Sequence, residues 1–254
     1  MSDVPQLLQR LQHHDRLALS RLLTLAAQGH LPLDQIPSPP EAAADSRMIA
    51  FIGGGGVGKS SLIGRLVEYL RERQQRVAVL CCDPQSPLTG GALLGDRIRI
   101  SQQGHDAGVF IRSLATRGGQ QAIAAHLDSM ARLLHAFGFA NVLVETVGAG
   151  QGDTAVAEIA DVVVVVVQPE SGDAIQWEKA GILEVADIVV VHKADLPGAD
   201  QAAAQLGEAL HLPGQRPVPI VQVSSAKRQG LAELWSAVGK VPARRMTASD
   251  RQSF

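Results

Sequence analysis

Short apolar runs recur along the chain from residue 48 onward, separated by polar or glycine-rich stretches. Most runs are rich in valine and isoleucine and span only five to seven residues, which favours buried β-strands over helices. The longest, Val162–Val167, is a row of six valines typical of a parallel strand covered on both faces. The expected strands are Met48–Ile52, Val77–Cys82, Asn141–Glu145, Val162–Gln168, Ile188–His192 and Pro219–Val223.

Between these strands, apolar residues recur every three or four positions, which is the period of an amphipathic helix. Helices are expected over Lys59–Gln74, Gln120–Ala136, Thr154–Ala160, Asp173–Leu183, Ala199–Leu210 and Leu231–Val238. This alternation predicts an α/β fold with a mostly parallel sheet and helices on both faces. Such sheets bind ligands at the carboxyl ends of their strands.

The N-terminal region has a different pattern, with helical stretches and no strand. Helices are expected at Val4–Gln12 and Arg16–Ala27, with Asp15 as N-cap of the second and Gly29 as its stop signal. A proline-containing stretch follows them. The predicted organisation is a small N-terminal helical appendage (1–35), a linker (36–47), one α/β domain (48–242) and a polar tail (243–254).

The segment Gly53–Ser60 joins the first strand to the first helix of this domain and matches the phosphate-binding pattern GxxxxGKS. Glycines let several backbone N–H groups converge on phosphate oxygens, and the helix N-terminus adds partial positive charge. Lys59 would neutralise phosphate charge, and the Ser60 hydroxyl would ligate magnesium. The flanking strand and helix favour this P-loop NTPase interpretation over a plain flexible turn. The predicted phosphate-binding residues are Gly55, Gly56, Val57, Gly58, Lys59, Ser60 and Ser61.

A candidate switch follows the strand Asn141–Glu145. Glu145 and the next residues, Thr146-Val147-Gly148, have the DxxG layout of GTPases with Glu in place of Asp. In that layout the carboxylate holds a magnesium-bound water and the Gly148 N–H senses the γ-phosphate. A structural glutamate that only ends a strand is the alternative.

Two further carboxylates are candidates for the metal shell. Asp83 ends the strand Val77–Cys82 at the same expected sheet edge, and its alternative role is a turn cap beside Pro84. Asp96 lies on the long connection Pro84–Gly108, and with Arg97 it could equally form a solvated ion pair. Connections of this length are usually functional or disordered. The candidate catalytic residues are Lys59, Asp83 and Glu145, and the candidate metal ligands are Ser60, Asp83, Asp96 and Glu145.

The stretch His192-Lys193-Ala194-Asp195 has the position of the NKxD motif that recognises guanine. Asp195 would accept from the guanine N1 and N2 groups, and the aliphatic stem of Lys193 would lie along the base. The stretch Ser224-Ser225-Ala226-Lys227 resembles the loop whose alanine N–H meets guanine O6, and Ser225, Ala226 and Lys227 are its candidate nucleotide-binding residues. These elements favour guanine over adenine. His192 replaces the usual Asn, and because an imidazole can donate one hydrogen bond but not a pair, weaker affinity or relaxed selectivity is expected.

Composition narrows the remaining function classes. With 254 residues and 46% hydrophobic content the chain can bury a sizeable core, and its net charge of −2 offers no basic surface for nucleic acid or anionic membrane. No secretory signal or membrane-length apolar run is found, so a cytoplasmic protein is expected. The adjacent Cys81 and Cys82 suit a reducing compartment and are interpreted as small buried residues, because neighbouring strand positions point to opposite faces and cannot jointly hold a metal.

Three segments together resemble the methylmalonyl-CoA mutase-associated GTPases, the ArgK or MeaB family. They are Asp83–Arg97, Val109–Ser113 and Val144–Gln151, and the stretch Asp15–Leu25 also fits. The resemblance covers roughly residues 7–240, and the long DPxSPxTGGxLLGDR loop is its most discriminating part. It implies slow GTP hydrolysis with Mg²⁺ and a chaperone role toward a cobalamin-dependent acyl-CoA mutase, in cofactor delivery, protection or reactivation. It also implies phosphate and magnesium roles for Lys59 and Ser60, metal-shell or switch roles for Asp83, Asp96 and Glu145, and base reading by Asp195.

The chain departs from the family pattern in two places. His192 stands where the family has Asn, and the residues after Arg244 are too short and polar to form the C-terminal helical arm that members use in dimerisation. The usual dimer is therefore not expected. The alternative functions are a small-molecule kinase on the same fold, a nickel-insertion GTPase, and a nucleotide-bound scaffold without turnover. The base-recognition elements disfavour the first, and the lack of a Cys/His cluster disfavours the second.

Overall fold

The computed structural model describes residues 4–43, 45–84, 106–116, 120–146, 151–169, 183–210 and 217–242. Its described strands form a seven-stranded sheet in the order β3-β2-β4-β1-β5-β6-β7, with every neighbouring pair parallel. The strands are β1 Arg47–Ile52, β2 Val77–Pro84, β3 Val109–Thr116, β4 Asn141–Glu145, β5 Val162–Val167, β6 Ile188–His192 and β7 Ile220–Val223. The sheet confirms the α/β fold predicted from the sequence.

One strand, β3, was absent from the strands expected above. It lies at the sheet edge beside β2, and Phe110, Ile111 and Arg112 are only half-buried. An edge strand needs fewer apolar residues than a central one, so its mixed composition hides it from a search for apolar runs. The other six strands have the expected positions within one or two residues at each end.

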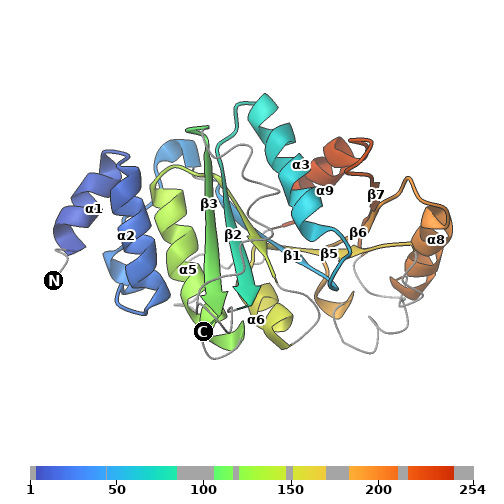
Figure 1. Ribbon diagram of the computed structural model, residues 1–254, viewed down its shortest axis with the longest axis horizontal. Coiled ribbons are helices and arrows are strands. Elements are labelled where there is room, and N and C mark those ends of the chain that lie inside the picture. Colours follow the sequence, from blue (N-terminus) through green and yellow to red (C-terminus); the bar gives the residue numbers. More distant parts are fainter. Residues whose placement is uncertain are drawn as a thin grey trace.

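The helices alternate with the strands, as expected. They are α1 Val4–Gln12, α2 Arg16–Ala27, α3 Lys59–Glu72, α5 Gln120–Ala136, α6 Gln151–Ile159, α8 Ala199–Leu210 and α9 Leu231–Lys240, with short 3₁₀ turns at Leu33–Gln35, Glu41–Ala43 and Leu183–Val185. Figure 1 shows α3 and α9 together on one side of the sheet and α5 and α6 on the other. The expected helix Asp173–Leu183 lies, except for its last residue, outside the described residues.

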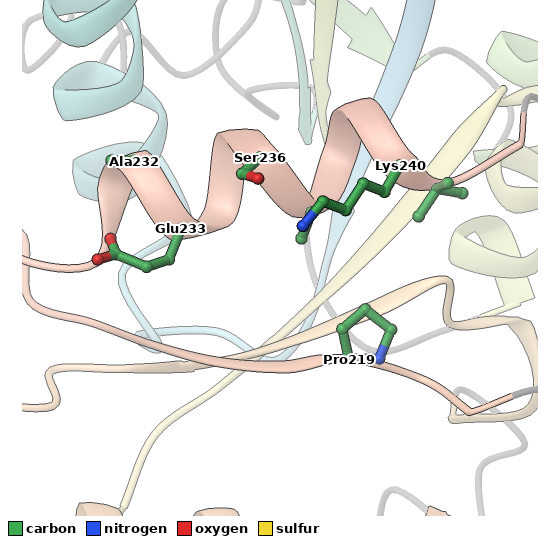
Figure 2. A pocket seen from close by; sticks show the side chains of 7 residues that line it. Pro219, Ala232, Glu233, Ser236 and Lys240 are labelled. Carbon is green, nitrogen blue, oxygen red and sulfur yellow. The ribbon is translucent and has the colours of Figure 1, made fainter.

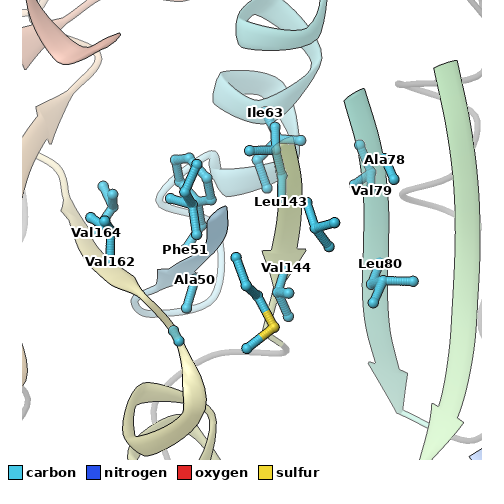
Figure 3. Packing of buried hydrophobic residues seen from close by; sticks show 14 of the residues in the cluster. Ala50, Phe51, Ile63, Ala78, Val79, Leu80, Leu143, Val144, Val162 and Val164 are labelled. Atoms are coloured by element: carbon cyan, nitrogen blue, oxygen red, sulfur yellow. The ribbon is translucent and has the colours of Figure 1, made fainter. Parts of the chain in front are cut away.

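The core explains why this sheet forms. Strands β1, β4 and β5 are almost wholly buried, and valine and isoleucine on both faces pack against the helices. In Figure 3, Ile63 of α3 reaches the sheet beside Leu143 of β4, with Phe51 of β1 close by. Burial of this apolar surface, about 25 cal/mol per Å², stabilises the sheet that carries the phosphate loop.

The N-terminal helices have the bounds that the sequence predicts. Asp15 caps α2, and its Oδ1 accepts hydrogen bonds from Leu17 N at 2.8 Å and Ala18 N at 3.1 Å. The helix ends at Ala27, two residues before Gly29, whose φ of 72° allows the N–H groups of Gly29 and His30 to bond the last carbonyls of the helix. Figure 1 places α2 against α5, and the buried leucines of α1 and α2 belong to the same core as the sheet. The boundaries of the four predicted segments stay predictions.

Candidate functional site

The phosphate loop begins where β1 ends and closes at Lys59, the first residue of α3. Its shape depends on glycine: Gly53 has φ +150°, and a Cβ there would lie 2.3 Å from Val166 O. Lys59 is buried, and its Nζ donates to Gly53 O at 2.8 Å and Gly54 O at 2.9 Å. A Cβ added to Gly55 or Gly56 would meet nothing within 4 Å. Gly55 and Gly56 are exposed, so the space beside them is open to a ligand, and the Lys59 side chain lies within the same loop.

Ser60 and Glu145 come together at the carboxyl edge of the sheet. Strand β4 pairs with β1 so that Glu145 lies opposite Phe51, two residues before the phosphate loop. The Ser60 Oγ donates to Glu145 Oε1 at 2.5 Å, and both side chains are buried. A hydroxyl and a carboxylate are hard oxygen donors, so the pair fits the magnesium site expected from the sequence.

The remaining acidic candidates are placed only in part. The backbone of Asp83 lies in β2, two residues beyond Cys81, which is opposite Glu145 in the β2–β4 register. This puts Asp83 at the same edge as Glu145, but its side chain is not among the described ones. Asp96 and Gly148 lie outside the described residues, as do Arg97 and most of the connection Pro84–Gly108.

His192 connects the turn after β7 to the phosphate loop. It ends β6 with 3% of its surface exposed, its Nδ1 lies 2.8 Å from Val57 O, and its Nε2 lies 2.7 Å from Ser225 Oγ. Burial is the main cause that lowers the pKa of His192, which favours a neutral ring. With His in place of the motif's Asn, the Nδ1 of residue 192 bonds the phosphate loop at Val57, and the Nε2 bonds Ser225 in the turn after β7.

Asp195 and Lys193 lie in the loop after β6, where the sequence predicts base contacts. The Ser224 Oγ donates to Asp195 Oδ1 at 2.5 Å and is the main reason why the pKa of that carboxyl is lowered. The Lys193 Nζ donates to Gly56 O at 3.2 Å and to Gln168 Oε1 at 2.6 Å. An ionised Asp195 is an acceptor only, as a guanine N1–H and N2 amine require.

The loop Ser224–Lys227 after β7 is held at both ends. Lys227 N donates to Ser224 Oγ at 3.1 Å, which closes a tight turn around Ser225 and Ala226. Arg65 of α3 donates from Nε to Ser225 O at 3.1 Å and pairs with Glu68 at 2.9 Å. The turn is thus positioned by the helix that carries Lys59 and Ser60.

Sequence reasoning gave no role in this region to two residues that the structure places there, Arg65 and Gln168. Gln168 directly follows β5, so the rule that ligands gather at carboxyl strand ends points to it. Arg65 gave no such signal, because its partner Ser225 is 160 positions away and only the packing of α3 brings them together.

A separate pocket of about 590 Å³ lies along α9 (Figure 2). It is lined by Pro219, Ala232, Glu233, Ser236, Ala237, Lys240 and Val241. Pro219 precedes the first residue of β7, so the end of the pocket at Pro219 and Lys240 is at the amino edge of the sheet, opposite the phosphate loop. Within the described ranges, no group of three or more His, Cys, Asp or Glu side chains is arranged to hold a metal ion. None of the described helices is both long and apolar enough to cross a membrane.

The geometry is that of a P-loop at the carboxyl edge of a parallel sheet, and comparison with known families agrees with this fold. Residues 33–253 match the model of the family described as methylmalonyl Co-A mutase-associated GTPase MeaB. The chain belongs to this family.

Individual relatives agree with the family. A curated protein of Pyrococcus abyssi named "Putative GTPase" is 38% identical over 243 residues, which cover 92% of this chain and 75% of that protein. A protein of Nocardia farcinica named fused isobutyryl-CoA mutase is 40% identical over 201 residues, 77% of this chain but 19% of the mutase. The crystal structure of a LAO/AO transport system kinase has a TM-score of 0.70 at 24% identity, covering 94% of this chain and 74% of that chain. At that identity the structural likeness establishes the fold alone.

Proposed function

We propose that this protein binds and hydrolyses GTP and serves as a chaperone for a cobalamin-dependent acyl-CoA mutase of the methylmalonyl-CoA mutase type. Its role would be to assist cofactor loading or to protect the loaded mutase. The observation that carries the proposal is the fused isobutyryl-CoA mutase, in which residues similar to this chain are part of a mutase polypeptide. Such a fusion supports a functional link between a GTPase of this family and a mutase.

Within the site, each role follows from position and chemistry. Phosphates would occupy the open space over Gly55 and Gly56, with Lys59 neutralising their charge. Ser60 and Glu145, with Asp83 and Asp96, would hold Mg²⁺, which when bound neutralises charge on the β- and γ-phosphates. The backbone of Gly148 would sense the γ-phosphate.

Slow intrinsic turnover is part of the proposal. Glu145 accepts from Ser60, the expected magnesium ligand, and so fits the metal shell better than the role of general base. P-loop GTPases of this kind commonly need a partner to complete the site. The segments Pro84–Gly108 and Glu145–Gln151 would change with nucleotide state and contact the mutase.

Lys59→Ala is expected to lower GTP affinity by about 100-fold, because a charge-assisted hydrogen bond contributes about 1.5–3 kcal/mol and phosphate charge would be left unpaired. Isothermal titration calorimetry measures the change. Lys240→Ala is the matched control, since Lys240 is an exposed lysine at the opposite edge of the sheet. Equal GTP affinity in wild type and Lys59→Ala would contradict the phosphate-loop assignment.

The mutase role is tested by thermodynamic linkage. If nucleotide state changes the affinity for a mutase, the mutase must change nucleotide affinity by the same factor. GTP hydrolysis and GDP affinity are therefore measured with and without saturating cobalamin-dependent acyl-CoA mutases, including a methylmalonyl-CoA and an isobutyryl-CoA mutase. A change of severalfold or more is expected with one of them. No change with any would refute the chaperone role and leave the nucleotide site intact.

A further inference from the structure

The His192 imidazole lies between the two loops that recognise phosphate and base, and it uses both of its nitrogens there. We infer that His192 is a positioning residue that fastens the base-reading loop to the phosphate loop and donates no hydrogen bond to the base. Guanine N7 is then not read by residue 192, and discrimination rests on Asp195 and the turn at Ser225 and Ala226. This inference rests on the proposed function in assuming a guanine nucleotide.

The tautomer follows from the partners. The Val57 carbonyl can only accept, so the ring must donate to it from a protonated Nδ1, 2.8 Å away. A neutral ring then has a lone pair on Nε2, which accepts from the Ser225 hydroxyl at 2.7 Å. Each ring nitrogen has one in-plane hydrogen-bonding position, and both positions are used within the protein. The His192 side chain therefore has no N–H group left to donate to N7 of a purine base.

Packing holds the ring in this orientation. His192 is 3% exposed, and a Cβ built on Gly58 would lie 2.5 Å from both its Cε1 and its Nδ1. The ring edge therefore rests directly on the phosphate-loop backbone, at a position whose φ of +96° already favours glycine. Turning the ring to face a base would break both hydrogen bonds.

The consequence for the base-reading turn is a fixed position relative to the phosphates. The Ser225 hydroxyl donates a hydrogen bond to His192, and the Ser225 carbonyl accepts one from Arg65 of α3 at 3.1 Å. The next residue is Ala226, whose N–H is expected to meet guanine O6. A continuous connection thus runs from Val57 in the phosphate loop through His192 and Ser225 to Arg65. Arg65 belongs to α3, the helix that follows the phosphate loop.

Asparagine at this position would behave differently for a simple chemical reason. A carboxamide has two N–H donors and an acceptor oxygen with two lone pairs, so it can make both loop contacts and keep one donor. His192→Asn is therefore expected to add a hydrogen bond to the base without removing the connection. Guanine and adenine both carry N7, so an N7 contact alone discriminates purines from 7-deazapurines.

The experiment compares nucleotide affinities of the full chain by calorimetry with GTP, 7-deaza-GTP, ITP and ATP. In the wild type, 7-deaza-GTP is expected to bind within about twofold of GTP, whereas ITP, which lacks the N2 amine that Asp195 accepts from, is expected to bind about tenfold more weakly. In His192→Asn, GTP should bind about tenfold better than 7-deaza-GTP. A tenfold loss with 7-deaza-GTP in the wild type would overturn the inference, and this arm needs no variant to fold.

The outcomes also separate this inference from the proposed function. ATP preferred over GTP in the wild type would refute the guanine assignment itself, whatever the 7-deaza ratio. A second readout is the tautomer: ¹⁵N NMR of the histidine-labelled protein should show His192 neutral with its proton on Nδ1, and Ser225→Ala should move the Nε2 shift while leaving Nδ1–H in place. A His192 proton on Nε2 would contradict the inference.

Discussion

At the scale of single residues, His192 shows how a substitution can keep one part of a motif and lose another. The sequence indicated a residue that donates one hydrogen bond where Asn makes a pair. In the structure the ring does form a pair, one donated to Val57 and one accepted from Ser225. Both partners are protein atoms, so the structural link is kept and the capacity for a base contact is what the imidazole gives up.

A second buried histidine, His135 at the end of α5, predicts a pH dependence of stability. Its Nδ1 lies 2.9 Å from Phe139 O, its Nε2 has no hydrogen-bond partner among the described residues, and burial lowers the pKa of its ring. At pH values between the folded and the unfolded pKa, the unfolded state therefore carries a proton on His135 and the folded state does not. The contribution of His135 to stability is fully present above the unfolded pKa of 6.5 and is lost as pH falls below it.

Between pH 7.5 and 5.5 the wild type should lose up to about 1.4 kcal/mol of unfolding free energy through this residue. His135→Asn, whose amide can still donate to Phe139 O, should lose correspondingly less over the same interval. Urea denaturation of both proteins at the two pH values measures the difference. Parallel pH profiles would show that His135 does not titrate between the folded and unfolded states.

At the scale of elements, two buried aspartates fasten neighbouring strands at the amino edge of the sheet. Asp161 precedes β5, donates its N–H to Met48 O at 2.9 Å and accepts from Met48 N at 2.7 Å. Asp187 precedes β6 and makes the same pair of contacts with Val163. Each aspartate bonds both backbone groups of a residue at the start of the adjacent strand. These two sets of hydrogen bonds therefore help to set the register of β1, β5 and β6.

Asp161 has a measurable signature. Burial raises the pKa of its carboxyl, while the bond from Met48 and the charge of Arg47 oppose this shift. A raised pKa means that its contribution to stability is fully present below 3.8 and is lost as pH rises through the folded pKa. Asp161→Asn keeps the acceptor without the charge and should be more stable than Asp161→Ala, which leaves the Met48 N–H unpaired at a cost of about 1–3 kcal/mol.

Chemical denaturation of the wild type and both Asp161 variants between pH 4 and pH 7 measures these free energies. The stability of Asp161→Asn relative to the wild type should rise with pH over this interval. Equal stability of the Asn and Ala variants would show that the Met48 hydrogen bond contributes nothing to the strand pairing.

At the scale of the whole molecule, the N-terminal helices pack as part of the main core. Leu19, Leu22 and Leu23 of α2 are fully buried, and α2 contacts α5 on the face opposite α3. Arg112 of β3 also donates to Ser20 O of α2 at 2.9 Å. These contacts predict that the N-terminal helices and the sheet unfold together.

Leu22→Ala should therefore destabilise the whole protein by about 2–5 kcal/mol in one cooperative transition, since it removes buried methyl groups and leaves a cavity. Leu17→Ala on the same helix is the control, because Leu17 is 55% exposed and its loss should cost less than about 0.5 kcal/mol. Denaturation followed by circular dichroism and by tryptophan fluorescence distinguishes the cases. Two separate transitions, with only the first shifted by Leu22→Ala, would show an independent N-terminal unit.

The sequence alone determined those features whose signal is local. The phosphate loop, the six apolar strands and the Asp15 cap of α2 each depend on residues within one short segment, and backbone geometry follows from their spacing. Strand β3 was not predicted, because it lies at the sheet edge and its half-buried residues do not form a continuous apolar run.

Only the tertiary structure decided which side chains meet across segments. Ser60 and Glu145 are 85 positions apart in the chain. They touch because β4 pairs directly with β1 in the sheet, although β2 and β3 lie between these two strands in the sequence. His192 reaches Val57 across 135 positions because β6 ends beside the phosphate loop with only β5 between it and β1. Strand order is set by how helices and sheet bury their apolar faces together, a global condition that no local motif contains. The sequence could thus propose nucleotide-binding residues, while the contacts that connect the phosphate loop to the Ser224–Lys227 turn come from the packing of the whole sheet.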